Sequence, residues 1–262
     1  MAILLLLSLP SFCLAQNTEP QCQIKGDFVQ FTTDKLQQVY TIDDKNEIKK
    51  FLPNCQEQFF YNNNRLGKIG SFDVSNPLNP MIFYPELQTL ILLDRTLSPT
   101  VEVNLLSWDI IQASCAALAV DNNLWIYDEV AFILKKVNQE GRAMIESPNL
   151  SLVFNQPPKP IQILARDNFV YLNDPEQGII IFDRFGQYQK TIDIKGVKQF
   201  ELLNDQMVLS SEDGFWTYSF KSFQLQQLEI PILKDATQVS IQKGMLFFLN
   251  ANGVSLIKGS SK

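Results

Sequence analysis

Histidine is absent from this chain of 262 residues, and basic residues are fewer than acidic ones. The lack of histidine excludes imidazole acid–base catalysis, Ser-His-Asp and Cys-His nucleophile sites, and metal centres with imidazole ligands. Lys and Arg total 22 against 28 Asp and Glu, which gives a net charge of −6 without a basic block. Because binding to a phosphate backbone needs clustered Lys and Arg, the sequence predicts no nucleic-acid partner.

Recognisable cofactor motifs are missing as well. The only GxxG segment, Gly67–Gly70, is too short for a phosphate-binding loop and favours a turn. Acidic pairs such as Asp43-Asp44 and Glu212-Asp213 lack the regular spacing of oxygen ligands in a calcium loop. No two carboxylates stand out as a general acid and its partner. We therefore predict that the protein is not an enzyme and has no catalytic residues, no cofactor and no metal ligands.

Long apolar runs are limited to the N-terminus. Ala2–Leu9 is apolar and ends at Pro10, which is too short for a transmembrane helix of about 20 residues. Cys13-Leu14-Ala15 then supplies acceptable residues before a cleavage site. We predict that residues 1–15 are a signal peptide and that residues 16–262 form one exported, periplasmic domain without direct membrane insertion. Lipidation of Cys13 is the alternative, which the bulky Phe12 disfavours.

Cysteine is scarce, and cleavage would leave Cys22, Cys55 and Cys115. An oxidising compartment permits a disulfide, and an odd number of cysteines leaves one thiol unpaired. Cys115 lies in the run of small apolar residues Ala113–Val120, so we expect it to be a buried thiol. Cys22 and Cys55 are the one pair worth testing, and the sequence leaves open whether they form a disulfide or stay unpaired.

A block of two short strands joined by an acidic or amide corner recurs along the chain, and no helix of ten residues is evident after the N-terminal run. The best copies are Val39–Phe51, Leu124–Val137 and Val170–Asp183, with weaker copies at Met207–Phe220 and Met245–Lys258. Their residues are rich in Val, Ile, Phe and Tyr and are punctuated by Asp, Asn, Gly and Pro. The block therefore predicts an array of β-hairpins rather than of helix pairs.

Six corners place the repeat, namely Asp43, Asp94, Asp128, Asp174, Asp213 and Asn250. Their mean spacing is about 41 residues, which is the length of a four-stranded propeller blade. We predict innermost strands at Phe28–Thr33, Ile110–Val120, Ile161–Ala165, Phe200–Asn204 and Gln238–Gln242, and outer strands at Gln187–Ile194 and Leu225–Ile230. The predicted fold is an all-β, six-bladed β-propeller. Its last blade lacks an outer strand, which residues around Gln21–Lys25 would supply, closing the ring.

The corner carboxylates have two interpretations. Asp and Asn at a corner accept hydrogen bonds from the backbone two residues on, so we expect them to form turns. The alternative is a ring of carboxylates that binds calcium on the propeller axis, as in some lactonase-like propeller hydrolases. Whether an ion occupies the axis stays open at this point.

Two stretches exceed the repeat: Ser71–Glu86, with three prolines, and Gly141–Pro160, with four. Such insertions are either binding loops or stiff spacers between blades. We expect most aromatic residues, including Trp125, Trp216, Phe182 and Phe185, to pack between blades. Glu57–Asn64 contains three successive aromatics, at least one of which must point outward. The candidate partner-binding residues are Phe59, Phe60, Tyr61, Asn76, Pro77, Tyr84, Phe154, Pro157 and Pro158.

Two segments carry a family resemblance. Leu124–Gly141 and Val170–Ile192 resemble the six-bladed NHL and TolB-like propeller repeat, most clearly in the FD-x-x-G turn at Phe182–Gly186. Gly67–Ser98 is similar to a group of short exported propellers typical of Bacteroidota, which includes the periplasmic plug subunit of the type 9 secretion translocon. This second resemblance implies a partner that is an outer-membrane β-barrel or a secretion-complex protein, against which the propeller seals a pore.

We therefore predict a non-catalytic periplasmic propeller that serves as a protein-binding subunit of an outer-membrane assembly in protein secretion. A calcium-dependent lactonase-like hydrolase and a glycan-binding propeller are the alternatives. The sequence does not identify the partner or the propeller face that docks.

Overall fold

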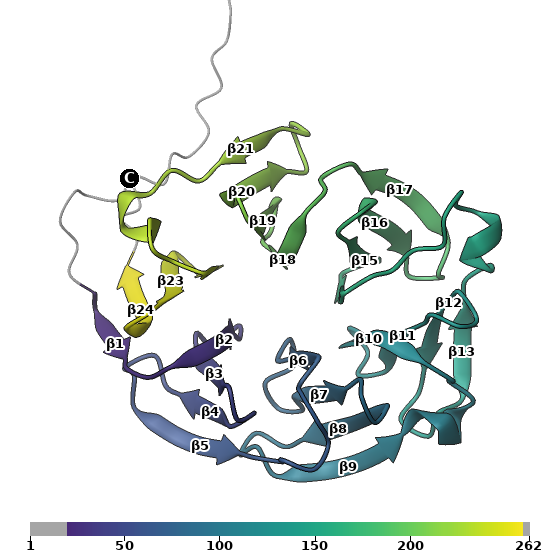
Figure 1. The fold of residues 1–262 in the computed structure, drawn as a ribbon, viewed down its shortest axis with the longest axis horizontal. Coiled ribbons are helices and arrows are strands. Elements are labelled where there is room, and N and C mark those ends of the chain that lie inside the picture. Colours follow the sequence, from purple (N-terminus) through teal and green to yellow (C-terminus); the bar gives the residue numbers. More distant parts are fainter. Residues whose placement is uncertain (1–19, 259–262) are drawn as a thin grey trace, which may run out of the picture.

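The computed structural model describes residues 20–258, which form six four-stranded antiparallel sheets arranged around a central axis (Figure 1). This arrangement confirms the predicted six-bladed β-propeller. The predicted signal peptide lies outside the described residues. Within the described range, no helix is both long enough and apolar enough to span a bilayer.

The blades follow one another in chain order, and each runs from an innermost to an outermost strand. Blade one contains β2 (Phe28–Thr33), β3 (Val39–Asp43), β4 (Ile48–Phe51) and β5 (Glu57–Tyr61). Blade two contains β6 (Ser71–Asp73), β7 (Met81–Tyr84), β8 (Thr89–Leu93) and β9 (Pro99–Asn104). Blade three contains β10 (Ala113–Leu118), β11 (Leu124–Asp128), β12 (Ile133–Val137) and β13 (Ala143–Glu146).

The second half repeats this plan. Blade four contains β14 (Gln162–Arg166), β15 (Phe169–Asp174), β16 (Gly178–Asp183) and β17 (Tyr188–Ile192). Blade five contains β18 (Val197–Leu202), β19 (Gln206–Ser211), β20 (Gly214–Ser219) and β21 (Leu225–Gln227). Blade six combines β22 (Gln238–Gln242), β23 (Met245–Asn250) and β24 (Gly253–Lys258) with β1 (Cys22–Ile24). Short 3-10 helices η1 (Leu105–Trp108), η2 (Leu150–Leu152) and η3 (Pro231–Leu233) lie in the connections between blades.

The second strands of the blades are largely apolar because each blade is sandwiched between two others, whereas the third strands β4 and β12 each contain two lysines. Every residue of β7 and β8 is buried. Trp125 and Phe182 share one core cluster between blades three and four, as predicted. Trp216 is half-buried against the core between blades four and five. Phe185 does not follow the prediction: it lies at the tip of the turn after β16, is exposed, and contacts the Arg184 guanidinium.

The ring is closed by the N-terminal strand β1, as predicted. Cys22, Gln23 and Ile24 pair antiparallel with Leu256, Ser255 and Val254 of β24. Gly253 opens β24 with a φ of +110°, and a Cβ there would lie 2.1 Å from the Ile24 carbonyl oxygen. Gly178 opens β16 in the same way against Ile192 of β17. The shared glycine requirement shows that β1 takes the place of a normal fourth strand.

A disulfide between Cys22 and Cys55 settles the question that the sequence left open. It joins the first residue of β1 to the turn between β4 and β5, with a Cα–Cα distance of 6.1 Å. The bridge therefore connects the closing strand of blade six to blade one. Cys115 is a free, buried thiol, as expected, and burial raises its pKa to about 12, which keeps it protonated and unreactive.

Side-chain amides join neighbouring blades at three seams. The Gln238 amide accepts a hydrogen bond from the Phe31 N–H at 2.9 Å and donates one to the Phe31 carbonyl oxygen, linking blades six and one. Gln162 makes the same pair with Phe200 between blades four and five. Gln88 makes it with Ala113 between blades two and three. Each amide satisfies two backbone groups that the inner strand cannot pair within its own sheet.

Two sequence assignments in blade two are wrong. Ser71–Glu86 is not an insertion, because it contains the inner hairpin of the blade, β6 and β7. Asp94 does not lie at the corner after the second strand: it follows β8, and Tyr84 ends the second strand instead. Asp94 accepts hydrogen bonds from the Thr96 and Ser98 N–H groups, the same turn chemistry as at the true corners. A turn motif alone therefore does not tell the two hairpins of a blade apart.

Candidate interaction surfaces

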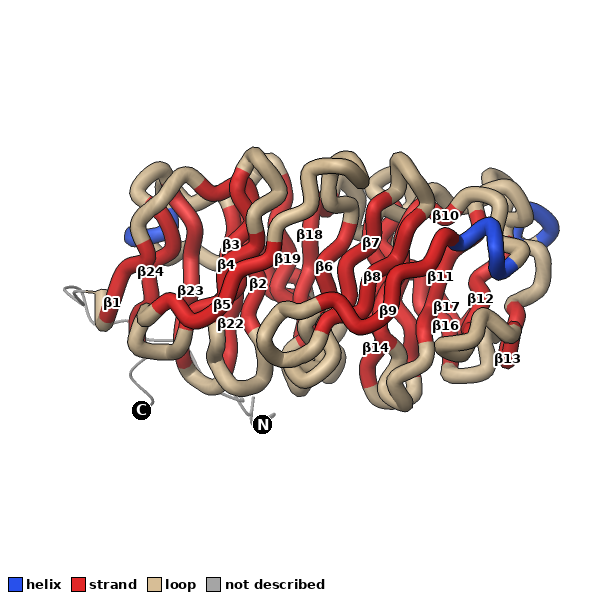
Figure 2. Tube along the Cα trace, turned by 90° about the horizontal axis from the view of Figure 1, so that it is seen from below, coloured by secondary structure: helices blue, strands red, loops and turns tan. Residues whose placement is uncertain are grey.

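The antiparallel blades place every loop on one of two opposite faces, which are visible edge-on in Figure 2. We call one the corner face. It carries the turns between second and third strands and the connections between blades, and its loops are 25–27, 44–47, 62–70, 85–88, 105–112, 129–132, 147–161, 175–177, 193–196, 212–213, 228–237 and 251–252. The opposite face, which we call the hairpin face, carries the remaining turns within blades.

Net charge is concentrated on the corner face. Its loops hold twelve acidic and seven basic residues, whereas the loops of the hairpin face hold six of each sign. The acidic residues of the corner face are Asp27, Asp44, Glu47, Glu86, Asp109, Glu129, Glu176, Asp193, Glu212, Asp213, Glu229 and Asp235, and the basic ones are Lys25, Lys45, Arg65, Lys68, Lys159, Lys195 and Lys234. The net charge of −6 is thus carried largely by one face.

Exposed apolar side chains also gather on the corner face. Apart from Ile232, they lie in the four loops 85–88, 105–112, 129–132 and 147–161, which belong to consecutive blades two to four. We call these loops the blade-three band. Its exposed apolar residues are Leu87, Leu106, Ile111, Val130, Leu152 and Val153, with Ile161 at its end. Leu152 is the most exposed large apolar residue of the described chain, at 87%.

Hydrogen bonds hold the four loops of the blade-three band together. The Leu105 N–H donates to the Gln88 carbonyl oxygen and the Glu129 N–H to the Gln112 carbonyl oxygen, both at 2.8 Å. The Leu150 N–H donates to the Phe132 carbonyl oxygen at 2.8 Å. These contacts span all four loops, so the apolar side chains stand on a fixed frame rather than on independent loops.

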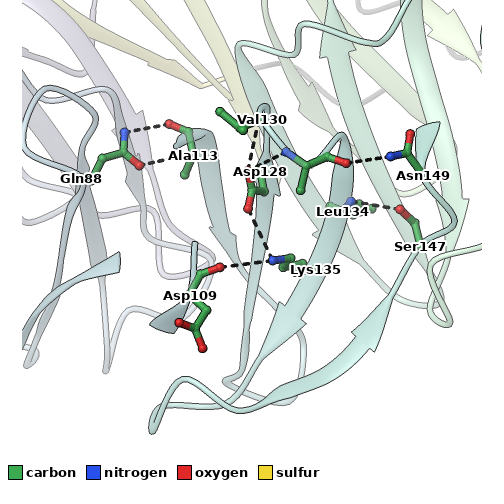
Figure 3. Close-up of polar contacts among 10 residues, drawn as sticks. Gln88, Asp109, Ala113, Asp128, Val130, Leu134, Lys135, Ser147 and Asn149 are labelled. Carbon is green, nitrogen blue, oxygen red and sulfur yellow. Dashed lines mark hydrogen bonds and ion pairs between the residues drawn. The ribbon is translucent and has the colours of Figure 1, made fainter. Parts of the chain in front are cut away.

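Buried and half-buried polar side chains hold these loops in place through further hydrogen bonds (Figure 3). The Asp128 carboxylate accepts hydrogen bonds from the Val130 and Ala131 N–H groups and pairs with the Lys135 ammonium at 3.4 Å. The Asn149 amide donates to the Ala131 carbonyl oxygen at 3.1 Å, and the Ser147 hydroxyl accepts from the Leu134 N–H at 3.0 Å. Because Asp128 is buried and paired with Lys135, its position and that of the 129–132 turn are fixed.

The hairpin face also exposes apolar residues, three of them in the inner hairpins of consecutive blades one to three. Leu36, Leu78 and Val120 each lie in the inner hairpin of a different blade. Phe185 and Phe223 lie in outer turns, where the Arg184 guanidinium and the Lys190 ammonium lie over their rings. Loops of this face are also joined, since the Asn76 amide donates to the Asn122 side-chain oxygen at 2.6 Å. The face differs from the corner face in that its loops have no net charge.

The structure does not bring the predicted partner-binding residues together. Tyr61, Pro77, Tyr84 and Pro158 are buried, so their side chains are not available to a partner in this fold. The others are half-buried or exposed but lie in three places. These are Phe59 and Phe60 on the outer strand β5, Asn76 on the hairpin face, and Phe154 and Pro157 on the corner face.

The prediction that the aromatic run of β5 turns at least one ring outward is confirmed by Phe60. Its ring is 64% exposed at the rim of blade one, whereas Phe59 packs inward near the Lys50 ammonium. The Gly141–Pro160 segment is mixed. Its first part contains strand β13, and its second part opens the longest connection between blades, loop 147–161.

Most of the corner carboxylates form turns, but Asp213 is exposed and accepts no hydrogen bond from its turn. Asp43 accepts hydrogen bonds from the Lys45 and Glu47 N–H groups, and Asp174 accepts from those of Glu176 and Gln177. Asn250 caps its turn through the Asn252 N–H. Within residues 20–258, no three Cys, Asp or Glu side chains converge into a group that could hold a metal ion. The turn-forming interpretation thus accounts for these corners without an ion.

One groove, of about 590 Å³, opens at the seam where the ring closes. It lies between β1 and blade one and is lined by both acidic and basic residues, including Asp27, Asp44 and Lys45. Lys49 in the groove pairs with Glu47 and Glu57. The charges of the groove are thus partly neutralised by one another.

Burial raises the pKa of two carboxyls of the inner strands, Asp73 on β6 and Glu201. Glu201 lies on β18 beside Ser240 of β22, and its Oε2 atom is buried without a hydrogen-bond partner. Burial raises its pKa from 4.5 to about 7, although hydrogen bonds from Ser240 and from the Ile241 backbone act in the opposite direction. The group therefore keeps its proton in the folded protein over a pH range in which the unfolded chain has lost it.

We expect the stability of the protein to fall between pH 4.5 and 7 because of Glu201. Its folded pKa is above its unfolded value, so the proton favours folding at low pH and this contribution is lost as pH rises through about 7. The replacement Glu201→Gln removes the ionisation. It should increase the free energy of unfolding at pH 8 by about 1–3 kcal/mol, seen as a higher melting temperature, and leave both nearly unchanged at pH 5. Equal effects of the variant at both pH values would contradict a buried, protonated Glu201.

Comparisons with known proteins support the fold alone. No protein-family model and no curated protein matches the chain. A catalytically inactive virginiamycin B lyase from Staphylococcus aureus has a TM-score of 0.57 at 12% identity, covering 90% of this chain and 96% of that one. BamB from Moraxella catarrhalis has a TM-score of 0.52 at 10% identity, covering 88% and 83%. The extracellular domain of BT4673 from B. thetaiotaomicron has a TM-score of 0.55 at 13% identity, covering 88% and 33%. The chain is thus a six-bladed propeller similar to those of lyases, BamB and Bacteroides sensor domains.

Proposed function

We propose that this protein is an exported, non-catalytic propeller that binds other proteins as a subunit of an outer-membrane assembly. The observation that carries the proposal is the corner face, where an apolar band stands on a rigid, hydrogen-bonded frame within an acidic surface. A large exposed apolar patch is typical of a protein-interaction site. The mechanism is steric: a rigid disc docks through its loops and holds or covers its partner.

The lack of histidine supports a non-catalytic role. The similar virginiamycin B lyase is described as catalytically inactive when one histidine is replaced by alanine. This chain contains no histidine, so no residue of that type is present to play the role of the replaced one. The Cys22–Cys55 disulfide supports export, because structural disulfides persist mainly in oxidising compartments.

The similarity of Gly67–Ser98 to exported Bacteroidota propellers supports a finer assignment. We propose that the assembly is a protein-translocation pore of the type 9 kind and that the propeller seals its periplasmic side. Fractionation of the host cell tests this proposal: the protein should sediment with the outer membrane and elute, after solubilisation, at a mass far above its own. Recovery as a free monomer in the soluble periplasm would overturn it.

Calcium should have no effect on the stability of the purified protein. Asp43, Asp128 and Asp174 already accept hydrogen bonds from their own turns, so a calcium-dependent hydrolase has no ready ligand ring at these positions. A bound ion at 100 times its dissociation constant would add about 2.7 kcal/mol. Melting curves recorded with calcium and with a chelator should therefore coincide, and a rise of several degrees with calcium would favour the hydrolase instead.

A further inference from the structure

Leu152 is presented to solvent by a loop that is fixed on both sides. Leu150, two residues before it, is buried in the core between blades three and four. Phe154, two residues after it, packs edge-on against Tyr188 of β17, with ring centroids 5.0 Å apart. Between them, the Leu152 N–H donates to the Asn149 carbonyl oxygen and the Phe154 N–H to that of Leu150. Leu152 is thus a rigid apolar projection.

The surroundings of Leu152 extend this projection into a patch. Val153 lies beside it on the chain, and Val130 and Ile111 belong to loops that are hydrogen-bonded to its own through Phe132 and Glu129. A projection that is already ordered loses little conformational entropy when a partner covers it. Interface residues of this kind contribute most of the binding energy when they are central and enclosed by a polar rim.

Charge identifies the chemistry of the partner. The four loops of the blade-three band contain three acidic residues, Glu86, Asp109 and Glu129, against a single basic one, Lys159. The whole corner face has the same excess of acid. A second copy of this face would bring like charges together, which is unfavourable, whereas a basic surface would be attracted.

We propose, resting on the function proposed above, that the blade-three band is the docking site for a protein partner. The partner presents an apolar pocket, rimmed by Lys and Arg, that receives Leu152. Phe154 and Asn149 position this side chain, and Glu86, Asp109 and Glu129 face the basic rim. The site lies on the corner face only, so the hairpin face stays free in the complex.

The test uses the mature protein, immobilised, as bait for detergent-solubilised outer membranes of the host. Leu152→Asp is compared with Leu78→Asp, a matched control that changes an exposed leucine of the hairpin face. Because both leucines are largely exposed, neither variant should unfold the protein, and melting curves check this. Benzoylphenylalanine placed at position 152 then crosslinks the partner and identifies the contacted segment by mass spectrometry.

The proposal expects a retained protein whose apparent affinity falls at least tenfold with Leu152→Asp and stays unchanged with Leu78→Asp. Its retention should weaken as sodium chloride rises from 50 to 500 mM, and the crosslinked segment should contain Lys or Arg beside apolar residues. Retention that survives Leu152→Asp, loss with Leu78→Asp only, or a crosslink to a second copy of this chain would overturn the docking site and leave the proposed function standing. Retention of no protein by any bait would overturn both.

Discussion

Removal of the Cys22–Cys55 disulfide should destabilise the propeller by about 3–4 kcal/mol. The bridge closes a loop with a sequence separation of 33 residues, for which the chain-entropy estimate lies between those for 15 and 100 residues. For a domain of this size, the loss corresponds to a fall of about 7–15 °C in melting temperature. The double variant Cys22→Ser, Cys55→Ser, followed by thermal unfolding, measures it.

The location of the bridge gives the effect a specific origin. Cys22 begins the strand that completes blade six, and only three residues of this strand pair with β24. Without the disulfide, β1 is free to leave β24 and expose the edge of that strand. Reductant should therefore lower the melting temperature of the natural protein to that of the double variant and have no effect on the variant, because Cys115 is unpaired. Equal melting temperatures of the oxidised protein and the variant would contradict this role.

Replacement of Gln238 by leucine should destabilise the protein by about 2–4 kcal/mol. The amide is the sole side-chain partner of the Phe31 N–H and carbonyl oxygen, and both residues are buried. Each buried backbone group left unpaired costs about 1–3 kcal/mol. Urea unfolding of Gln238→Leu measures the loss as a lower midpoint.

Gln162→Leu is the matched control for this experiment. Gln162 makes the same two hydrogen bonds with Phe200, but it is only partly buried, so water can replace the lost amide more readily. The ring-closing seam is also joined by the Thr33 and Ser240 hydroxyls, 2.7 Å apart, which the loss of Gln238 would disturb. We therefore expect the smaller loss for Gln162→Leu. Equal losses in the free energy of unfolding at the two seams would contradict a larger contribution of the closing seam to stability.

The architecture could be predicted from the sequence because the repeat leaves two physical signs. Second strands read as largely apolar runs, and most of them are followed by a residue that forms a turn. The last blade had too few residues for a fourth strand, so closure by residues near Gln21 followed from the need to cover the edge of β24. The structure confirms both inferences.

Blade two shows where the pattern is insufficient. Its second strand ends at Tyr84 without an acidic corner, whereas Asp94 after the third strand forms the same turn as Asp43. Both ends of a blade use this turn because it depends only on local backbone geometry. Placing the corner at Tyr84 makes the spacing of second-strand ends more even, from 37 to 46 residues.

The candidate site was harder to predict, since burial and exposure depend on tertiary contacts. The aromatic residues chosen from the sequence are mostly part of the core, as Tyr84 shows, or position other residues, as Phe154 does. The sequence pattern did not mark Leu152 as exposed, because a leucine in a short apolar run has the same pattern whether its side chain is exposed or buried. The charge difference between the two faces can be counted from the sequence only once the strand order assigns each loop to a face.

The central claim is that the corner face of a closed propeller binds a protein partner. Hydroxyl-radical footprinting of the mature protein, alone and in complex with the outer-membrane protein it retains, tests this claim directly. The account predicts that Leu152, Val130 and Ile111 become protected, while Leu78 and Val120 keep the reactivity of the free protein. Protection of Leu78 and Val120 with an unchanged Leu152 would contradict it.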